Sequence, residues 1–386
     1  MKNIALCSIV MATLLLASCG SKPKNTAADA ETDAAVPARS EAAVAMLGKM
    51  AAVSQQKLLL FGHQDDPSYG HSWNGCTGDP AMEGRSDTKD VCGDYPGIIG
   101  FDLGDIENGV DKNLDGVPFD KIRKEAVAQY LRGGLVTMSW HCDNPLTGGD
   151  AWDFSNKGTV ESILEGGSQY EKFQEWLGRV ADFLGSIETP DGTKVPVLFR
   201  PWHEHTGSWF WWGQDICTQE QYVALWRMTF EFMQARGVNN LLWAYGPGAE
   251  PVDQQTYLER YPGDDIVDVM GFDTYQGADR DQYMQTMKRC LDIVVEAAAT
   301  HGKVPAVTET GYESTPDPTW WTGTLLPAIG DAPVAYVLVW RNAWDKPDHH
   351  YGIYPGHESE ADFMTFYNDP RTLFAKNIFH FTHEIL

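Results

Sequence analysis

The chain has 386 residues, a net charge of −25 and 43% hydrophobic residues, so it can bury a large core. Its acidity excludes partners that need a basic footprint, chiefly nucleic acid and anionic lipid surfaces, and leaves a neutral polymer open. Without the leader and tether described next, residues 41–386 form one domain, long for a usual domain but normal for a barrel with large loops.

The first 18 residues predict a leader that is not part of the fold. Met1–Asn3 is a short basic head, and Ile4–Ala17 is an apolar run too short to span a bilayer. Leu16–Cys19 resembles the bacterial lipobox, in which Cys19 becomes the lipidated N-terminus after cleavage. An ordinary secretory signal with an incidental cysteine is the alternative. Residues 19–40 lack apolar periodicity and predict a flexible tether after this lipid anchor.

The residues after Cys19 predict the location. Gly20–Lys24 is basic, unlike the acidic run that resembles a surface-export tag in lipoproteins of gut Bacteroidetes. We therefore expect a chain that is lipid-anchored outside the cytoplasm of a Gram-negative bacterium, on the periplasmic face rather than the cell surface. We also expect a monomer.

Five cysteines remain beyond the leader and the lipobox, an odd number for an oxidising compartment. Cys76 and Cys92 bracket a loop rich in Gly and Asp, and a disulfide between them would close it. Cys142 and Cys217 follow strands that we expect side by side, so they are a second possible pair. No Cys-x-x-Cys spacing typical of zinc sites is present.

Short apolar runs alternate with segments of helical spacing, the pattern of βα units and a parallel sheet. The spacing is clear in the apolar residues of 173–184 and 222–233, which precede the fourth and fifth runs. The eight predicted strands are Leu58–Gly62, Ile98–Asp102, Leu135–Trp140, Val197–Pro201, Leu241–Tyr245, Val267–Phe272, Val304–Thr308 and Val334–Trp340. Eight strands and no internal repeat predict an α/β fold, a single-domain (β/α)8 TIM barrel.

Polar side chains follow seven of these strands at the point where each ends. Because the carboxyl ends of barrel strands meet on one face, these side chains converge where such barrels keep their active sites. Any one of them could be a satisfied structural group, but seven at the same end are hard to explain by packing. They begin at Gly62, Asp102, Trp140, Trp202, Asp273, Thr308 and Trp340.

The segment Arg200–Gly213 contains four tryptophans, two histidines and one glutamate in fourteen residues. Flat apolar rings such as those of 209–212 stack on sugar faces, and Glu204 stands beside them at the end of a strand. The combination indicates a carbohydrate-cleaving site. An aromatic core patch with one satisfied glutamate is the alternative, although a core seldom needs three polar residues in succession at 203–205.

A second glutamate completes the chemistry. Glu204 ends the fourth strand and Glu309 the seventh, so their side chains face each other across the barrel mouth and can approach to about 5 Å, the separation for hydrolysis with retention. Glu204, beside tryptophans that exclude water, suits the acid/base. Glu309, which we expect within reach of Arg341 and Tyr275, suits the nucleophile.

At these residues the chain resembles glycoside hydrolase family 26, chiefly the β-mannanases of the clan whose catalytic glutamates follow barrel strands four and seven. The motifs occur in the expected order over most of the chain. They are Ser139–His141 with Asn144–Pro145, Arg200–Glu204, Gly207–Gly213, Gly271–Tyr275, Thr308–Gly311 and Val339–Asn342.

The resemblance implies a retaining hydrolase of β-1,4-mannan with Glu204 as acid/base and Glu309 as nucleophile. The residues expected to bind substrate are His141, His203, Trp209, Trp212, Tyr275, Trp340 and Arg341. One departure is His205, where relatives with this motif often have Met.

We expect neither a metal nor another cofactor. Asp111–Gly116 begins like a calcium loop, but the twelfth position is Ile122 instead of the bidentate glutamate, so a polar turn is the better interpretation. His203 and His205 could bind a metal, yet next to a catalytic glutamate they are better explained as substrate contacts.

The long loop at 67–95 suggests a restricted groove, because long loops in compact domains are usually functional or disordered. We hypothesise that it walls the glycone side and favours release of mannobiose from chain ends. Two alternatives stay open: another β-glycan hydrolase of the same family, such as a lichenase or a xylanase, and a non-catalytic glycan-binding lipoprotein. The second should have lost a catalytic carboxylate, whereas both glutamates are present.

Overall fold

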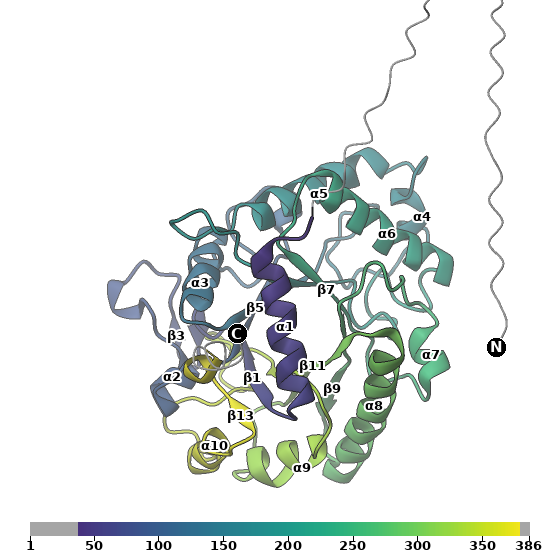
Figure 1. The fold of residues 1–386 in the computed structure, drawn as a ribbon. Coiled ribbons are helices and arrows are strands. Elements are labelled where there is room, and N and C mark those ends of the chain that lie inside the picture. Colours follow the sequence, from purple (N-terminus) through teal and green to yellow (C-terminus); the bar gives the residue numbers. More distant parts are fainter. Residues whose placement is uncertain (1–37, 379–386) are drawn as a thin grey trace, which may run out of the picture. The chain divides into compact units, whose positions relative to one another are not determined.

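A computed structural model describes residues 38–378 and confirms the barrel, a curled sheet of parallel strands surrounded by helices (Figure 1). The strands of the sheet are β1 (Leu59–Gln64), β4 (Ile98–Asp102), β5 (Leu135–Trp140), β6 (Val197–Pro201), β7 (Leu241–Tyr245), β8 (Val269–Met270), β9 (Asp273–Gln276), β10 (Val304–Pro305), β11 (Val307–Tyr312), β12 (Tyr336–Val339) and β13 (Thr372–Leu373). The predicted leader, the lipidation site Cys19 and the tether up to residue 37 lie outside the described residues.

The sheet closes through two strands that are each divided. The neighbours run in the order β10-β8-β7-β6-β5-β4-β1-β12-β11-β9, and every pair is parallel. β8 and β9 are successive pieces of the sixth strand, and β10 and β11 are successive pieces of the seventh. The order begins with β10-β8 and ends with β11-β9, so the sixth and seventh strands stand at both of its ends and the sheet is closed. Counting each divided strand once gives the eight predicted strands. The short β13 pairs with β1 outside this path.

The predicted bounds hold to the residue for β4, β5, β6 and β7 and differ elsewhere. The sixth predicted strand divides near Gly271, where an added Cβ would lie 2.4 Å from the side chain of Thr308, so this side chain leaves no room for a larger residue. The seventh divides at Ala306, and its register against β12 shifts between Val307 and Thr310. The register shift in β11 spans Glu309, and bulges of this kind re-aim side chains.

The helices surround the barrel, and most lie in the loops that return the chain to the next strand (Figure 1). The predicted apolar faces are buried, with Phe173, Trp176 and Leu177 in α5 and Tyr222 and Trp226 in α6. The α-helices are α1 (Glu41–Gln55), α2 (Asp87–Cys92), α3 (Phe119–Leu131), α4 (Thr159–Ile163), α5 (Tyr170–Gly185), α6 (Gln219–Ala235), α7 (Gln254–Leu258), α8 (Arg280–His301), α9 (Leu326–Ile329) and α10 (Glu360–Tyr367). The remaining elements are the hairpin β2 (Tyr69–Gly70) and β3 (Trp73–Asn74), and the short helices η1 (Pro80–Met82), η2 (Ile106–Asn108) and η3 (Trp321–Leu325).

Helix α1 crosses one open end of the barrel (Figure 1). Its buried side chains, among them Met46 and Met50, join the cluster formed by the inward-facing residues of the strands, such as Leu60 and Leu198. Arg39 pairs with Asp268, at 2.8 Å, just before β8 begins. Residues 38–40 are therefore part of the folded domain, and the predicted tether boundary at residue 40 is too late.

Neither of the two possible disulfides, Cys76–Cys92 and Cys142–Cys217, forms, because all five cysteines of the described residues are free. The Cys76 thiol donates to the carbonyl of Ser68, and the Cys92 thiol to the carbonyl of Asp94, at 3.6 and 3.4 Å. Cys142 and Cys217 are buried without pairing, each with its thiol directed at a nearby carbonyl.

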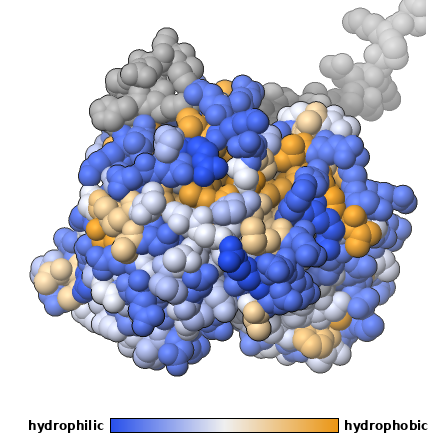
Figure 2. Space-filling model, turned by 90° about the horizontal axis from the view of Figure 1, so that it is seen from below, coloured by the Kyte–Doolittle hydropathy of each residue, from blue (hydrophilic) through white to orange (hydrophobic). Residues whose placement is uncertain are grey.

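One face of the molecule can be described by its hydropathy. The face seen in Figure 2 is hydrophilic over most of its area, with hydrophobic side chains gathered mainly in its upper part. Within residues 38–378, none of the helices has the length and apolar character needed to cross a membrane.

Candidate active site

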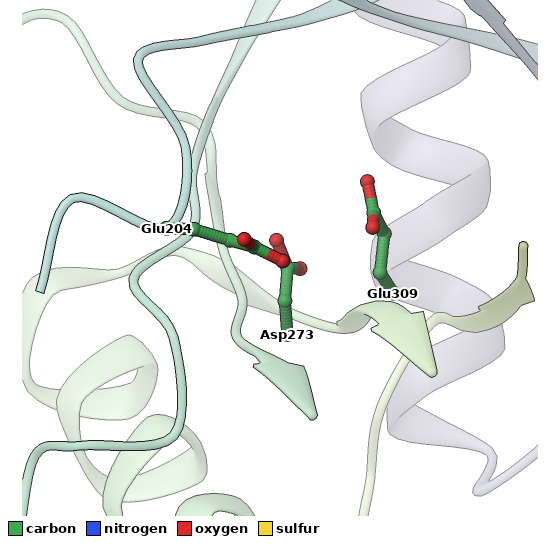
Figure 3. Close-up of side chains that lie close together, drawn as sticks. All are labelled: Glu204, Asp273 and Glu309. Carbon is green, nitrogen blue, oxygen red and sulfur yellow. The ribbon is translucent and has the colours of Figure 1, made fainter. Parts of the chain in front are cut away.

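Three carboxyl groups meet at the carboxyl ends of the strands. Glu204 follows β6, Asp273 begins β9 and Glu309 lies in β11, and one carboxylate oxygen of each lies within 4.8 Å of the others. Figure 3 shows Glu204 reaching towards Asp273, with Glu309 beside them on the neighbouring strand. This spacing agrees with the expected separation of about 5 Å and is shorter than the roughly 6.5–9.5 Å of inverting pairs.

Glu309 is held by two donors, one on each carboxylate oxygen. The hydroxyl of Tyr275 donates to Oε2 at 2.6 Å, and the guanidinium of Arg200 donates to Oε1. Arg200 also donates to Asp273 at 2.8 Å, and all three charged groups are buried. These donors fix the position of the carboxylate that attacks carbon.

The expected contact between Glu309 and Arg341 is wrong. Arg341 pairs with Asp115 at 2.9 Å and donates to the hydroxyl of Tyr69 at 3.3 Å. Tyr69 in turn donates to Asp65 at 2.9 Å. Arg341 therefore belongs to a charged group beside β1 and β12. The cation at the nucleophile is Arg200, a motif residue for which no role was predicted.

Glu204 has the environment of a proton donor. Its burial, followed by the charge of Glu309, raises its pKa to about 7, although the Nε1–H of Trp209, which donates to its Oε2 at 2.8 Å, acts in the opposite direction. The backbone of Glu204 is left-handed, with φ 50°, as is that of Trp202, with φ 54°. Such conformations are rare for bulky side chains and persist where the surrounding structure holds them.

His141 is fixed by a buried carboxylate. Its Nδ1 lies 2.7 Å from Asp102, which also accepts from the hydroxyl of Ser139 at 2.6 Å. Burial alone would lower the pKa of His141 and raise that of Asp102, but their mutual attraction outweighs both effects. The pKa of His141 is raised, and that of Asp102 is lowered to about 2.

The aromatic rings near His141 form the rest of the rim. His141 lies 4.7 Å from His203 and 6.2 Å from Trp340, measured between ring centroids, so three predicted substrate-binding residues do come together. Trp152 stacks on His141 at 5.1 Å and is 44% exposed. Trp152 lies in a loop without periodic spacing, so no sequence pattern distinguishes it from other tryptophans.

The predicted sugar platform is much smaller than the stretch 209–212. Trp209 is 38% exposed, whereas Trp211 and Trp212 are completely buried and Phe210 nearly so. Trp212 donates to the carbonyl of His203 at 2.8 Å and stacks against Phe210 at 4.5 Å. The prediction that Trp212 contacts substrate is therefore wrong, because this ring supports the backbone of His203 from behind.

His205 is also directed away from the rim. It is fully buried between the hydroxyls of Tyr222 and Tyr245, at 2.8 and 3.1 Å, and its burial lowers its pKa well below the usual value. The expectation of a substrate contact is wrong for His205, which acts as a structural link between α6 and β7.

The loop at 67–95 is held by hydrogen bonds. Asp87 accepts from the backbone N–H of His71 and from Nε1 of Trp73, both at 2.6 Å, and from Asn342 at 2.9 Å. The ring of His71 also stacks on Tyr354 at 3.7 Å. These contacts attach the hairpin β2–β3 to the segment after β12, beside Arg341.

A closed parallel barrel with two glutamates this close at its carboxyl-end rim has the architecture of a retaining glycoside hydrolase. Residues 37–321 match Glycosyl hydrolase family 26, and the chain belongs to this family. The resemblance inferred from the motifs is thereby confirmed at the level of the family.

Solved structures agree. A GH26 β-mannanase from Bacteroides ovatus is 52% identical, with a TM-score of 0.83, over 86% of this chain and 94% of that one. A modular endo-β-1,4-mannanase from Cellulomonas fimi is 33% identical, with a TM-score of 0.78, over 89% of this chain and 77% of that one.

Curated relatives match this chain over part of their own length. A mannan endo-1,4-β-mannosidase from Bifidobacterium adolescentis is 32% identical in an alignment of 316 residues that covers 75% of this chain and 31% of the relative. An enzyme of the same name from Bacillus subtilis is 28% identical over 50% of this chain and 55% of its own length. The chain thus spans about a third to a half of these relatives.

Proposed function

We propose that the protein is a retaining β-1,4-mannan hydrolase that acts on mannan, galactomannan or manno-oligosaccharides by double displacement. The observation that carries this proposal is the pair Glu204 and Glu309, with carboxylate oxygens within 4.8 Å and with donors on both oxygens of Glu309. The names of the relatives, most of them mannan endo-1,4-β-mannosidases, support mannan as the substrate.

In the first step, Glu309 attacks the anomeric carbon and forms an ester bond to it. The bond from that carbon to the leaving sugar's oxygen breaks, and its electron pair stays on this oxygen, which takes the proton of Glu204. A pKa of about 7 keeps a large share of Glu204 protonated near neutral pH. Tyr275 and Arg200 hold the attacking carboxylate in position.

In the second step, Glu204 has become a carboxylate and removes a proton from water. The water oxygen attacks the anomeric carbon, and the ester bond to Glu309 breaks, which restores both residues and retains the configuration. Arg200 and Tyr275 then stabilise the charge that returns to Glu309.

Azide rescue tests the two roles separately. In Glu309→Ala, azide should replace the missing nucleophile and give an α-mannosyl azide. In Glu204→Ala, azide should intercept the glycosyl-enzyme and give a β-mannosyl azide. Substantial hydrolysis by Glu309→Ala without azide would contradict the assignment and would leave a glycan-binding role as the better explanation.

A substrate screen tests the choice of glycan. One weaker relative is an Endoglucanase H from Acetivibrio thermocellus, 26% identical over 41% of this chain, so a β-glucan is a reasonable second candidate. We expect turnover of linear mannan to exceed that of lichenan, glucomannan and xylan. Faster turnover of lichenan or xylan would replace mannan by that glycan.

We propose further that the loop at 67–95 limits the glycone side and favours release of mannobiose. The supporting observation is its attachment through Asp87 and His71 to the segment after β12, beside Arg341. Digestion of reduced mannohexaose should give mannobiose early. An early ladder of random sizes would contradict this proposal.

We also propose that a lipid on Cys19 anchors the protein on the periplasmic face. The support is the lipobox-like sequence Leu16–Cys19 and the basic residues that follow it. Palmitate labelling of the wild type but not of Cys19→Ala, with protection from protease in intact cells, is the expected result. Degradation of the labelled protein in intact cells would place it on the surface instead.

A further inference from the structure

A small cavity of about 210 Å³ opens beside Tyr275, and its other lining residues are not part of the active site described above. It lies between the end of β9, the loop at 277–279 and the first turns of α8. A bound water takes about 30 Å³, so the cavity holds about seven waters. The cavity is smaller than the roughly 300 Å³ at which pockets for drug-sized ligands begin, and its volume suits one sugar ring.

The cavity extends from Tyr275 away from the catalytic carboxylates. Successive side chains of a strand point to opposite faces, and on β9 Tyr275 points inward to Glu309 while Gln276 points outward to Trp320. Both Tyr275 and its outward-facing neighbour Thr274 line the cavity. It therefore extends from Tyr275, the hydrogen-bond donor to the nucleophile, around the end of β9 towards the first turns of α8.

The lining suits hydroxyl groups. The amide of Gln282 and the hydroxyl of Thr286 have no hydrogen-bond partner within residues 38–378, whereas the hydroxyl of Tyr283 is taken up by Thr310 at 2.7 Å. Gly277 contributes no side chain, and an added Cβ there would meet nothing within 4 Å. The cavity thus offers free polar groups and an aromatic ring, the combination that sugars require.

The position relative to the nucleophile identifies the sugar. Strands β12 and β9 lie on opposite sides of β11, which carries Glu309. If the side of β12 and β1 is the glycone side, as the proposed function holds, the cavity beside β9 is on the leaving-group side. We propose that this pocket takes a single hexosyl branch linked to C6 of the first sugar of the leaving group, such as the galactosyl branch of galactomannan. This proposal rests on the proposed mannanase function.

The experiment compares a linear manno-oligosaccharide with the same chain carrying one α-1,6-galactosyl branch. For Gln282→Ala, kcat/KM on the branched substrate should fall about threefold to tenfold relative to the linear one, as for one lost hydrogen bond. Gly277→Trp, which fills the pocket, should lower this ratio further. Gln285→Ala, on the exposed side of the same helix and outside the pocket, should keep the wild-type ratio.

Product analysis fixes the position of the branch. The wild type should release fragments in which the first sugar of the leaving group carries the branch, and Gly277→Trp should shift cleavage away from that bond. An unchanged ratio in both pocket variants, or wild-type cleavage that avoids this bond, would overturn the proposal. A wild type without activity on the linear substrate would instead refute the proposed function, so the two failures are distinguishable.

Discussion

Glu204 and Glu309 are both glutamates at strand ends, yet their surroundings prepare them for opposite tasks. Glu309 receives two donors, one of them cationic, whereas Glu204 receives only the indole N–H of Trp209 and lies close to the negative charge of Glu309. Pairs of titratable groups whose environments differ in this way are typical of acid and base assignments.

The raised pKa of Glu204 predicts the alkaline limb of the pH profile. The first step needs Glu204 protonated, so kcat/KM should fall as pH rises through about 7. Trp209→Phe removes a donor that stabilises the carboxylate, so this limb should move to higher pH by about one unit, since such a bond is worth about 1.5 kcal/mol. The pH dependence of kcat/KM measures the shift.

Trp344→Phe is a matched control, because Trp344 is another exposed tryptophan that follows a barrel strand, and within the described residues it forms no hydrogen bond to Glu204. Its alkaline limb should coincide with that of the wild type. A limb that moves to lower pH in Trp209→Phe would contradict the role of the indole N–H.

Tyr275 supplies the neutral donor to Glu309, and its removal should cost activity more than stability. A hydrogen bond to a charged group is worth about 1.5–3 kcal/mol, so Tyr275→Phe should lower kcat about 10- to 100-fold. The ring remains, and the melting temperature should stay close to that of the wild type. A kcat within twofold of the wild type would exclude a catalytic contribution of this hydroxyl.

At the scale of elements, the loop at 67–95 depends on one carboxylate. Burial and the nearby Asp66 raise the pKa of Asp87 to about 6, and the three donors around it act in the opposite direction. The pKa is above that of the unfolded chain, so the ionised group is costly in the folded state, and its hydrogen bonds offset this cost.

Asp87→Ala should free the loop, because it leaves the backbone of His71, the indole of Trp73 and the amide of Asn342 without their acceptor. We expect destabilisation by about 1–3 kcal/mol in urea unfolding and a wider range of products from mannohexaose. Asp90→Ala removes an exposed carboxylate of the same helix, which forms an ion pair with Arg85, and it should change neither quantity. A product pattern unchanged in Asp87→Ala would show that the loop does not determine the size of the products.

The accuracy of the sequence predictions also varies with the element. Strands β4 to β7 were predicted to the residue because each is a buried apolar run with polar residues at its end. The divided strands could not be foreseen, because features such as the close approach of Gly271 to the side chain of Thr308 on the next strand depend on how the strands pack.

For the site residues, the place along the strand could be predicted from the sequence, but the partner towards which each side chain points could not. The placement of Glu204 opposite Glu309 followed from strand order, whereas the partner of Glu309 depends on which cation crosses the barrel interior. Arg200 does so from β6, and Arg341 turns to Asp115. The burial of Trp212 was likewise invisible, since composition shows that rings are present and not which of them face solvent.

At the scale of the whole molecule, the catalytic residues and the helix that covers the barrel lie at opposite ends of the barrel. The catalytic residues lie at the carboxyl ends of the strands, and α1 covers the other end, where its apolar side chains complete the interior of the sheet. Barrels of this kind keep stability and activity at separate faces, so the two should respond independently to mutation.

Met50→Ala tests this separation. Met50 is completely buried between α1 and the barrel, and truncation of such a side chain costs about 2–5 kcal/mol of unfolding free energy through the cavity left behind. Val44→Ala, on the exposed side of the same helix with the side chain 57% accessible, should cost less than about 0.5 kcal/mol. Both variants should keep the kcat of the wild type on linear mannan below their unfolding transitions. A loss of kcat in Met50→Ala while the protein remains folded would show instead that the packing of α1 is transmitted through the strands to Glu204 and Glu309.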